Sequence, residues 1–181
     1  MPCEQEAQTR RWQAMGEIQI REVLPAEYED TGSLTQRAYA EYARPGDPLW
    51  DDYFGMLADV ARRAVFATVL VAVADGHVVG TATVEHDQTI EGTEGLESGQ
   101  ANLRVLAVDP WVRGRGVGRR LVQECVQVAR RAGKEVATLH TTEQMVAAQH
   151  IYRTLGFRRD PSGDVELHPG LVLQAFRLPL R

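Results

Sequence analysis

Leu103–Leu121 reads LRVLAVDPWVRGRGVGRRL, and the rest of the chain can be interpreted outward from it. The first part of this stretch, together with the preceding Asn102, forms a mostly apolar run, Asn102–Val108, that is typical of a strand. The second half passes through a turn rich in glycine and arginine into a helix that begins near Gly116. At such a junction several backbone N–H groups lack partners and point to one spot, where the helix dipole also favours negative charge. The stretch therefore predicts a binding site for a phosphate or pyrophosphate.

The glycines and arginines of this turn suit such a ligand, because glycine allows close approach and arginine supplies positive charge. The residues concerned are Gly114, Gly116 and Gly118, with Arg113, Arg115, Arg119 and Arg120. Two common phosphate motifs do not fit: a dinucleotide fingerprint needs its third glycine where Arg119 stands, and no P-loop string occurs. A plain tight turn with solvated arginines is the alternative. We disfavour it because the glycines coincide with a strand-to-helix junction.

The chain has 181 residues and a formal net charge of −5, which suits a single globular domain. The charge is unevenly spread: Met1–Leu103 carries 7 basic and 18 acidic residues, whereas Arg104–Arg131 carries 7 basic and 2 acidic ones. A short basic stretch inside an acidic protein indicates a local anionic ligand. A nucleic-acid partner would need a broad basic face, so we do not expect one.

We expect a cytoplasmic protein without a membrane or metal partner. The longest apolar run, Ala64–Ala74, has 11 residues, whereas a membrane-spanning helix needs about 20. The N-terminus lacks the apolar core of a signal peptide, and Met15 leaves open whether the start is Met1 or Met15. The two cysteines make no disulfide framework or metal-ligand spacing, and Cys125 lies on the apolar stripe of a helix, as a buried hydrophobe would.

The remaining elements alternate in type along the chain. We expect strands at Ile18–Val23, Ala64–Ala74, His77–His86, Val136–His140, from Phe157 onward and at Leu171–Leu178; helices at Pro25–Tyr42, Leu49–Arg63 and Gly116–Gly133, and after a capping box at Thr141–Gln144. This order indicates one α/β domain at residues 17–181, preceded by a flexible N-terminal extension at residues 1–16.

Two motifs resemble those of the GCN5-related N-acetyltransferase (GNAT) family. Arg113, Gly116 and Gly118 match its acyl-CoA signature R-x-x-G-x-G, and Ala148–Phe157 matches A-x-x-I-Y-x-x-L-G-F. The likeness extends in element order from Ile18 to Leu178. It implies a single α/β domain with a mixed, mostly antiparallel central sheet of six to seven strands and about four helices. The sheet would be splayed between the strands at 102–108 and 136–140.

By this resemblance the cofactor is acetyl-CoA, bound as a co-substrate. The strand before the signature would pair with the pantetheine arm, and the Leu106 N–H would lie near the thioester carbonyl as an oxyanion-type donor. The amides of the turn would hold the pyrophosphate. The implied cofactor residues are Leu106, Ala107, Val108, Arg113, Gly114, Arg115, Gly116, Val117, Gly118, Arg119 and Ala148.

The resemblance also suggests catalytic residues. Tyr152 holds the position of the family's usual general acid, which protonates the departing thiolate; a core tyrosine on the apolar stripe is the alternative. For the general base we select Glu85 at a strand end, with His86 or a water chain as rivals and an exposed carboxylate as the alternative. His140 ends another strand, and we interpret it as structural. The family's asparagine is replaced by Met145, and Asn102 stands where relatives often carry an acidic residue.

The predicted function is acetyl-CoA-dependent N-acetyl transfer to a primary amine by direct attack in a ternary complex. The acceptor would be a small-molecule amine, a protein N-terminus or a lysine. Glu91, Glu94 and Glu97 form an acidic stretch that could attract a cationic amine, although charged loops are usually just solvated. The alternative is a catalytically idle acyl-CoA-binding module. Dimers are common in the family, so a homodimer stays open.

Overall fold

The computed structural model describes residues 16–43, 48–86, 96–97, 99–168 and 170–180. Its strands are β1 (Gln19–Glu22), β2 (Thr68–Ala74), β3 (His77–Glu85), β4 (Gln100–Val108), β5 (Val136–Thr141), β6 (Arg158–Arg159), β7 (Val165–His168) and β8 (Leu171–Pro179). Its α-helices are α2 (Tyr28–Tyr39), α3 (Pro48–Ala58), α4 (Val60–Phe66), α5 (Val117–Arg131) and α6 (Val146–Thr154). Short 3-10 turns include η2 (Ala40–Tyr42), η3 (Pro110–Val112) and η4 (Pro161–Gly163).

The strands form one mixed sheet in the order β1-β2-β3-β4-β5-β8-β6, with β7 paired to β8. Only the β4–β5 pair is parallel; the other pairs among the described residues are antiparallel. This confirms the predicted α/β class and the mostly antiparallel mixed sheet. The described residues form eight strands and five α-helices, slightly more than the six to seven strands and about four helices expected.

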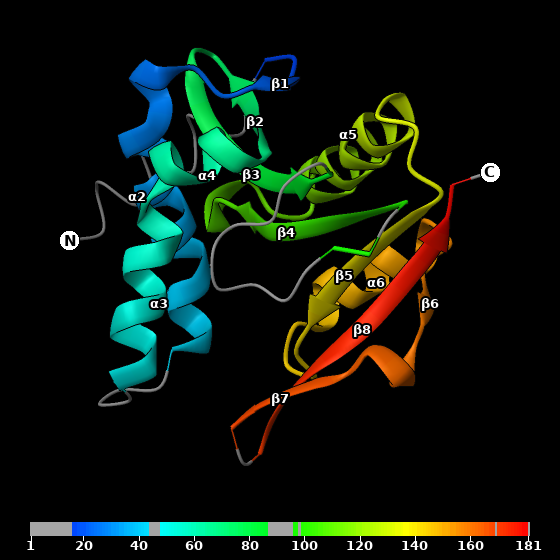
Figure 1. The fold of residues 1–181 in the computed structure, drawn as a ribbon. Coiled ribbons are helices and arrows are strands. Elements are labelled where there is room, and N and C mark those ends of the chain that lie inside the picture. Colours follow the sequence, from blue (N-terminus) through cyan, green and yellow to red (C-terminus); the bar gives the residue numbers. More distant parts are fainter. Residues whose placement is uncertain (1–15, 44–47, 87–95, 98, 169, 181) are drawn as a thin grey trace.

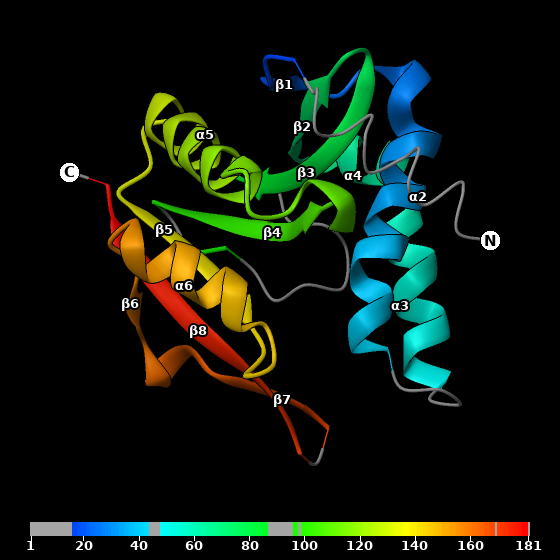
Figure 2. The same ribbon diagram turned by 180° about the vertical axis from the view of Figure 1, so that it is seen from behind.

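Helices cover the two faces of the sheet differently. Viewed from behind, α5 and α6 lie in front of the strands (Figure 2), while α2, α3 and α4 stack together on the other side of β2–β4 (Figure 1). Gly80 on β3 lets α5 approach closely, since a Cβ there would lie 3.0 Å from Leu121 Cδ1 and 3.1 Å from Val117 Cγ1. Cys125 on α5 is buried in this core, as its place on the apolar stripe predicts.

The segment expected to be one helix at Leu49–Arg63 is two helices. The Asp59 side chain accepts a hydrogen bond of 2.9 Å from the Arg62 N–H and so begins α4 at Val60. Arg63 is buried and donates to the Met56 and Leu57 carbonyls at 2.7 and 2.9 Å, which satisfies the end of α3. The strand expected from Ala64 was wrong at its start, because α4 continues to Phe66 and β2 begins at Thr68.

The capping box expected at Thr141–Gln144 is not used. Helix α6 begins at Val146, and its N-cap Met145 makes no side-chain cap. Instead the buried Gln149 side chain donates 2.9 Å to the Thr142 carbonyl and holds the preceding turn. No helix in the described part of the chain is both long and apolar enough to cross a membrane.

Candidate functional site

The parallel pairing of β4 and β5 is short. Gln100–Leu103 pair with Val136–Leu139, and beyond them the two strands diverge (Figure 1). On its other edge β4 stays paired with β3 as far as Val108, which lies opposite Gly80. The sheet is therefore splayed between β4 and β5, as the family resemblance implies.

The backbone of β4 directs unpaired amides into this gap. Asp109 donates its N–H to the Val79 carbonyl on β3 at 3.0 Å. Because N–H groups alternate between the two edges of a strand, those of Val108 and Leu106 point away from β3, toward the gap. Ala107 by contrast turns its backbone groups toward β3, where it lies opposite Thr81. The expected pantetheine contacts therefore fit the backbone of Leu106 and Val108, whereas the Ala107 side chain is buried in the core with α2.

A bulge in β4 precedes these amides. The β3–β4 register shifts between Thr81 and Thr83, and Val105 has a φ of 51°. A β-branched residue in the left-handed region is strained and is found mostly at functional sites. The bulge also reverses the alternation of faces: Leu103 and Leu106 pack in the core with α5, whereas Val105 packs in the core with α2.

The N-terminus of α5 forms a cradle for an anion. Gly114 and Gly116 have φ values of 80° and 77°, and a Cβ on either would meet nothing within 4 Å. The N-cap Gly116 supplies no side-chain cap, so the first amides of α5 stay available. Gly118 packs close to Ile151 and Val108, where a Cβ would lie 3.1 and 3.4 Å from their side chains. The open cradle, left-handed glycines and helix end fit a pyrophosphate.

The four arginines of the turn divide into two pairs. Arg115 and Arg119 are exposed, and neither has a side-chain partner in the described part of the chain, so both can approach a phosphate. Arg113 is instead ion-paired with Glu41 of η2 at 2.8 Å and donates to the Ala38 carbonyl at 3.3 Å. This pairing raises the pKa of Arg113 and lowers that of Glu41. Arg120, the other arginine of the turn with a partner among the described residues, donates to the Ile18 carbonyl at 2.8 Å.

A second ion pair holds the same turn to α2. Arg37 Nη2 lies 3.4 Å from the Asp109 carboxylate, which also accepts a 3.1 Å hydrogen bond from the Trp111 N–H. In the Arg37–Asp109 pair the cation lies on α2 and the carboxylate on the side of the signature turn, whereas in the Arg113–Glu41 pair the cation lies in the turn and the carboxylate in η2. The signature arginine therefore positions the turn, while the backbone remains free to bind.

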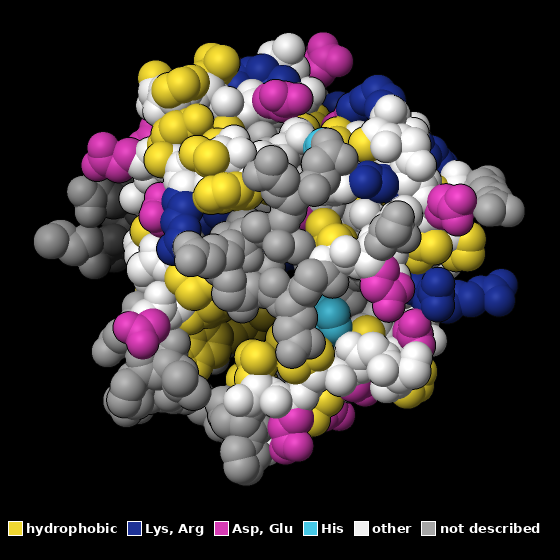
Figure 3. All heavy atoms as spheres, in the orientation of Figure 1, with side chains coloured by type: hydrophobic (Ala, Val, Ile, Leu, Met, Phe, Trp, Pro, Cys, Tyr) yellow, Lys and Arg dark blue, Asp and Glu magenta, His cyan; other side chains and the backbone are white. Residues whose placement is uncertain are grey.

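A cavity lies at the splay and reaches from α5 and α6 to α2. Its lining residues are Tyr39, Ala82, Leu103, Arg104, Val105, Leu106, Val122, Cys125, His140, Met145, Ala148 and Tyr152. In the orientation of Figure 1, a hollow bordered by hydrophobic side chains is visible between the α2–α3 pair and β5–β8 (Figure 3). Three predicted site residues, Leu106, Ala148 and Tyr152, line this cavity. Arg104 and His140 also line it; the sequence analysis interpreted His140 as structural and singled out no role for Arg104.

Tyr152 is buried and packs against Phe157 and Phe176, with ring centroids 6.0 and 6.3 Å away. Burial raises the pKa of Tyr152 well above the usual range, so its hydroxyl remains protonated. None of the described residues hydrogen-bonds this hydroxyl. Tyr152 is thus a core tyrosine and also a protonated donor on the cavity wall, and the two interpretations offered by the sequence are compatible.

Glu85 lies beside the cavity without lining it. Its side chain is 1% exposed, and Arg104 Nη1 and Asn102 Nδ2 donate to its two oxygens at 3.1 and 3.3 Å. Asn102 in turn accepts from Thr138 Oγ1 at 3.4 Å. The carboxylate is therefore engaged by side chains of the sheet, and Arg104 is its link to the cavity. The rival His86 contacts Thr68 Oγ1 at 3.2 Å and does not line the cavity.

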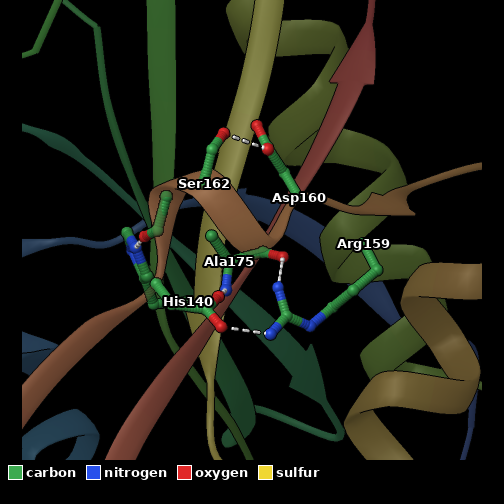
Figure 4. Close-up of polar contacts among 7 residues, drawn as sticks. His140, Arg159, Asp160, Ser162 and Ala175 are labelled. Atoms are coloured by element: carbon green, nitrogen blue, oxygen red, sulfur yellow. Dashed lines mark hydrogen bonds and ion pairs between the residues drawn. The ribbon is translucent and has the colours of Figure 1, made fainter.

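His140 has a defined orientation at the cavity wall. Its Nε2 lies 2.8 Å from the Gly163 carbonyl oxygen, a contact drawn in Figure 4. A carbonyl only accepts, so Nε2 carries the hydrogen, and in the neutral ring Nδ1 holds the lone pair. The sequence signal for His140 is the alternation of side chains along β5: it follows Thr138 by two residues and therefore lies on the same face of the sheet.

The acidic stretch lies mostly beyond the described residues. Glu91 and Glu94 fall outside them, and Glu97 is exposed and accepts a hydrogen bond of 2.5 Å from Gln100. The expected N-terminal extension, residues 1–16, falls outside them as well except for Gly16. In the part of the chain that the structure covers, no group of three or more His, Cys, Asp or Glu side chains could hold a metal ion.

Solved structures with the same fold include acetyltransferases. A GNAT acetyltransferase from Staphylococcus aureus superposes with a TM-score of 0.71 at 19% identity, over 91% of this chain and 100% of that one. An N-acetyltransferase from Thermoplasma acidophilum, in complex with coenzyme A, gives 0.70 at 14%, over 91% and 99%. A Salmonella typhimurium protein, solved with its cofactor acetyl-CoA, gives 0.65 at 24%, over 92% and 95%. These likenesses show a shared fold.

Sequence comparison identifies the family. Relatives named N-acetylaspartate synthetase, from Rattus norvegicus and Homo sapiens, are 33% identical over 106 residues, or 57% of this chain. The chain spans only 32% of the length of these relatives. The profile of the acetyltransferase (GNAT) family matches residues 22–157, which include the splayed strands, the anion cradle and Tyr152. The chain belongs to the acetyltransferase (GNAT) family.

Proposed function

We propose that the protein transfers the acetyl group of acetyl-CoA to a primary amine by direct attack in a ternary complex. The observation that carries this proposal is the alignment of three features along one path. They are the open cradle at Gly114–Gly118, the inward amides of Leu106 and Val108, and the cavity that contains Tyr152. A long ligand with a pyrophosphate at one end and a thioester at the other fits such a path. Acetyl-CoA supplies the activated acetyl group.

In this proposal each residue has a separate task. Arg115 and Arg119 join the amides of the cradle in binding phosphates, and Ala148 leaves room beside the pantetheine arm. The Leu106 N–H donates to the acetyl oxygen as negative charge develops on it. Tyr152, which lines the cavity and whose hydroxyl stays protonated throughout the neutral range, donates its proton to the departing thiolate.

The proposed acceptor is an amine. The N-acetylaspartate synthetases are named for an N-acetylated amino acid, which supports an amine nucleophile here. The cationic acceptor expected from Glu91, Glu94 and Glu97 remains a prediction, as do Glu85 as general base and the flexible residues 1–16. An idle acyl-CoA-binding module remains the second candidate, because the cradle and the inward amides would serve it equally.

Turnover separates the two candidates. We expect acetyl-CoA and a panel of primary amines to give free thiol and acetylated amine, whereas binding of CoA without thiol release for any amine would leave only the idle module. Tyr152→Phe should lower kcat by about 100-fold, the usual share of a general acid. Calorimetric CoA affinity should stay unchanged, because Phe keeps the packing against Phe157 and Phe176. Unaltered kcat in this variant would remove Tyr152 from the mechanism.

A further inference from the structure

We propose that Arg104 and His140 form the acceptor subsite, in which Arg104 binds a carboxylate carried by the acceptor amine and His140 takes a proton from its ammonium group. This inference rests on the proposed function and names a substrate class for the same cavity. The acceptor would be an amino acid or another amine with a nearby carboxylate. The two residues belong to different strands, and the splay of the sheet brings them to one cavity.

The register of β4 and β5 places the two side chains on the same face. Asn102 lies opposite Thr138 in the parallel pair, and their side chains meet at 3.4 Å. Arg104 shares the face of Asn102, because both side chains bind Glu85. His140 shares the face of Thr138 by alternation along β5. One step beyond the last paired residues, Arg104 and His140 therefore lie on either side of the opening, and both line the cavity.

The charge of the described cavity lining favours an anion. Arg104 is the only cation of fixed charge in that lining, which contains no aspartate or glutamate. Only Nη1 of Arg104 is committed to Glu85, and its other guanidinium nitrogens have no hydrogen-bond partner among the described residues. The Arg104 side chain is 26% exposed. A planar guanidinium with free donors matches a carboxylate in both charge and geometry.

Glu85 acquires a different task in this arrangement. Its carboxylate is buried and fixes the Arg104 guanidinium, while the adjacent Asn102 fixes the carboxylate. Glu85 is then a positioning residue that acts on the acceptor through Arg104. This assignment competes directly with the prediction that Glu85 is the general base.

His140 is prepared to accept a proton. The Gly163 carbonyl fixes the hydrogen on Nε2 and leaves the Nδ1 lone pair, to which no described residue donates. Figure 4 shows the ring beside the turn that carries Ser162, and the N–H of Asp160, which precedes this turn, donates to the Ala175 carbonyl on β8 at 2.9 Å. The Gly163 carbonyl thus orients the ring, and His140 lines the cavity.

The acceptor nitrogen loses two protons in the reaction. Nδ1 of His140 removes one proton from the ammonium, which gives the free amine. The amine nitrogen forms a bond to the acetyl carbon, the bond from that carbon to sulfur breaks, and Tyr152 gives its proton to the thiolate. The nitrogen loses its second proton in forming the amide, and that proton restores Tyr152 through water. His140 finally releases its proton to solvent, so one proton leaves per turnover.

The test compares L-amino acids with their amino-acid amides, which keep the size and the amine and lack the carboxylate. We expect kcat/KM to be at least about 10-fold higher for the acids, as for a hydrogen bond to a charged group. Arg104→Gln should abolish this preference, chiefly by raising KM for the acids to the value for the amides. Arg131→Gln, an exposed arginine on α5, is the matched control. Equal kcat/KM for acids and amides in the wild type would overturn the assignment of Arg104.

Arg104→Gln leaves Glu85 buried without its partner, so a double variant guards against misfolding. Glu85→Gln with Arg104→Gln removes both charges and should show the same lost preference. If the Glu85→Gln variant alone loses kcat to the same extent with acids and amides, Glu85 is the base and the positioning role is wrong. Thiol release with any amine upholds the proposed function, whichever way these comparisons fall.

His140 is tested by chemical rescue. His140→Ala should lower kcat by about 100-fold, and added imidazole should restore part of it, because a small base can occupy the vacated space. A merely structural histidine would not respond to imidazole. His150→Asn, an exposed histidine of α6, is the control and should keep full activity. Unchanged kcat in His140→Ala, or a loss that imidazole does not relieve, would overturn the assignment of His140.

Discussion

At the scale of single residues, the Glu85–Arg104 pair couples stability to the site. Removal of one partner leaves a buried charge uncompensated, which costs about 3 kcal/mol. Arg104→Gln should therefore lower the free energy of unfolding in urea by about that amount. The double variant with Glu85→Gln should recover most of the loss, because no charge is left unpaired. Equal losses in the single and double variants would show that packing, and not charge, determines the effect.

Buried phenols make stability depend on alkaline pH. A tyrosine in the unfolded chain has a pKa of about 10, whereas burial raises the pKa of Tyr39 and Tyr152 in the folded protein. Above the pKa of the unfolded tyrosine, the folded state binds more protons than the unfolded one. The free energy of unfolding should then fall by up to about 1.4 kcal/mol per pH unit for each group. Below the pKa of an unfolded tyrosine, the two phenols make their full contribution to the free energy of unfolding.

Urea unfolding between pH 8 and pH about 11 measures this slope. Tyr152→Phe removes one titrating group and should reduce the decline. Cys125 contributes to the slope in both the wild type and the Tyr152→Phe variant, because burial raises the pKa of its thiol to about 12. A decline of equal steepness in the two proteins would mean that Tyr152 ionises in the folded state as it does in the unfolded one.

The sequence predicted single residues well where a motif fixed them and poorly where only the fold brings them together. Tyr152, Leu106 and Ala148 came from two motifs, and all three line the cavity. Arg104 and His140 lie on strands 36 positions apart in the chain, and only the β4–β5 register makes them neighbours. Glu85 was identified as a site residue, but its partners on β4 are cross-strand contacts that no local pattern encodes.

At the scale of elements, α5 offers a matched pair of glycines. Gly116 precedes the helix and Gly133 follows it, with φ values of 77° and 70°, and a Cβ on either would meet nothing within 4 Å. Alanine at each position should cost about 1 kcal/mol through the left-handed backbone alone. Only Gly116→Ala places a methyl group in the cradle, so only that variant should weaken CoA binding.

Calorimetric titration of both alanine variants with CoA checks this expectation, and urea unfolding verifies that their stabilities match. Weakened binding in Gly133→Ala as well would indicate that general destabilisation of α5, and not obstruction of the cradle, lowers the affinity.

The ends of helices and strands were predictable where hydrophobic periodicity determines them, and were not where individual side-chain hydrogen bonds determine them. The apolar stripe of α5 and the glycines at its ends predicted that helix to within a residue or two. The break between α3 and α4 depends on Asp59 capping one helix and Arg63 satisfying the other. The apolar residues Ala64–Phe66 continue so smoothly into β2 that composition alone could not separate them. At Thr141–Gln144 a capping-box spacing occurs, but Thr141 is the last residue of β5.

At the scale of the whole molecule, the order of strands determines where the splay occurs. Among the described residues, the strand pairing between the two halves of the sheet, β1–β4 and β5–β8, covers four positions of β4 and β5. The described part of the chain ties each half to its own helices, with α2 and α4 on the first and α6 beside the second (Figures 1 and 2). The resemblance to a family predicted this architecture, whereas composition and periodicity established only the α/β class.

The splay has a consequence for deuterium uptake. Central strands of a sheet normally exchange their amide hydrogens slowly, yet Leu106 and Val108 direct theirs into the gap. We expect these two amides to take up deuterium quickly, while Asp109, bonded to Val79, stays protected. CoA should slow exchange at Leu106 and Val108 and leave Asp109 unchanged; slow exchange at all three without CoA would contradict the assigned directions. Amide exchange in the middle of the sheet, which is ordinarily the slowest, therefore reports whether CoA is bound.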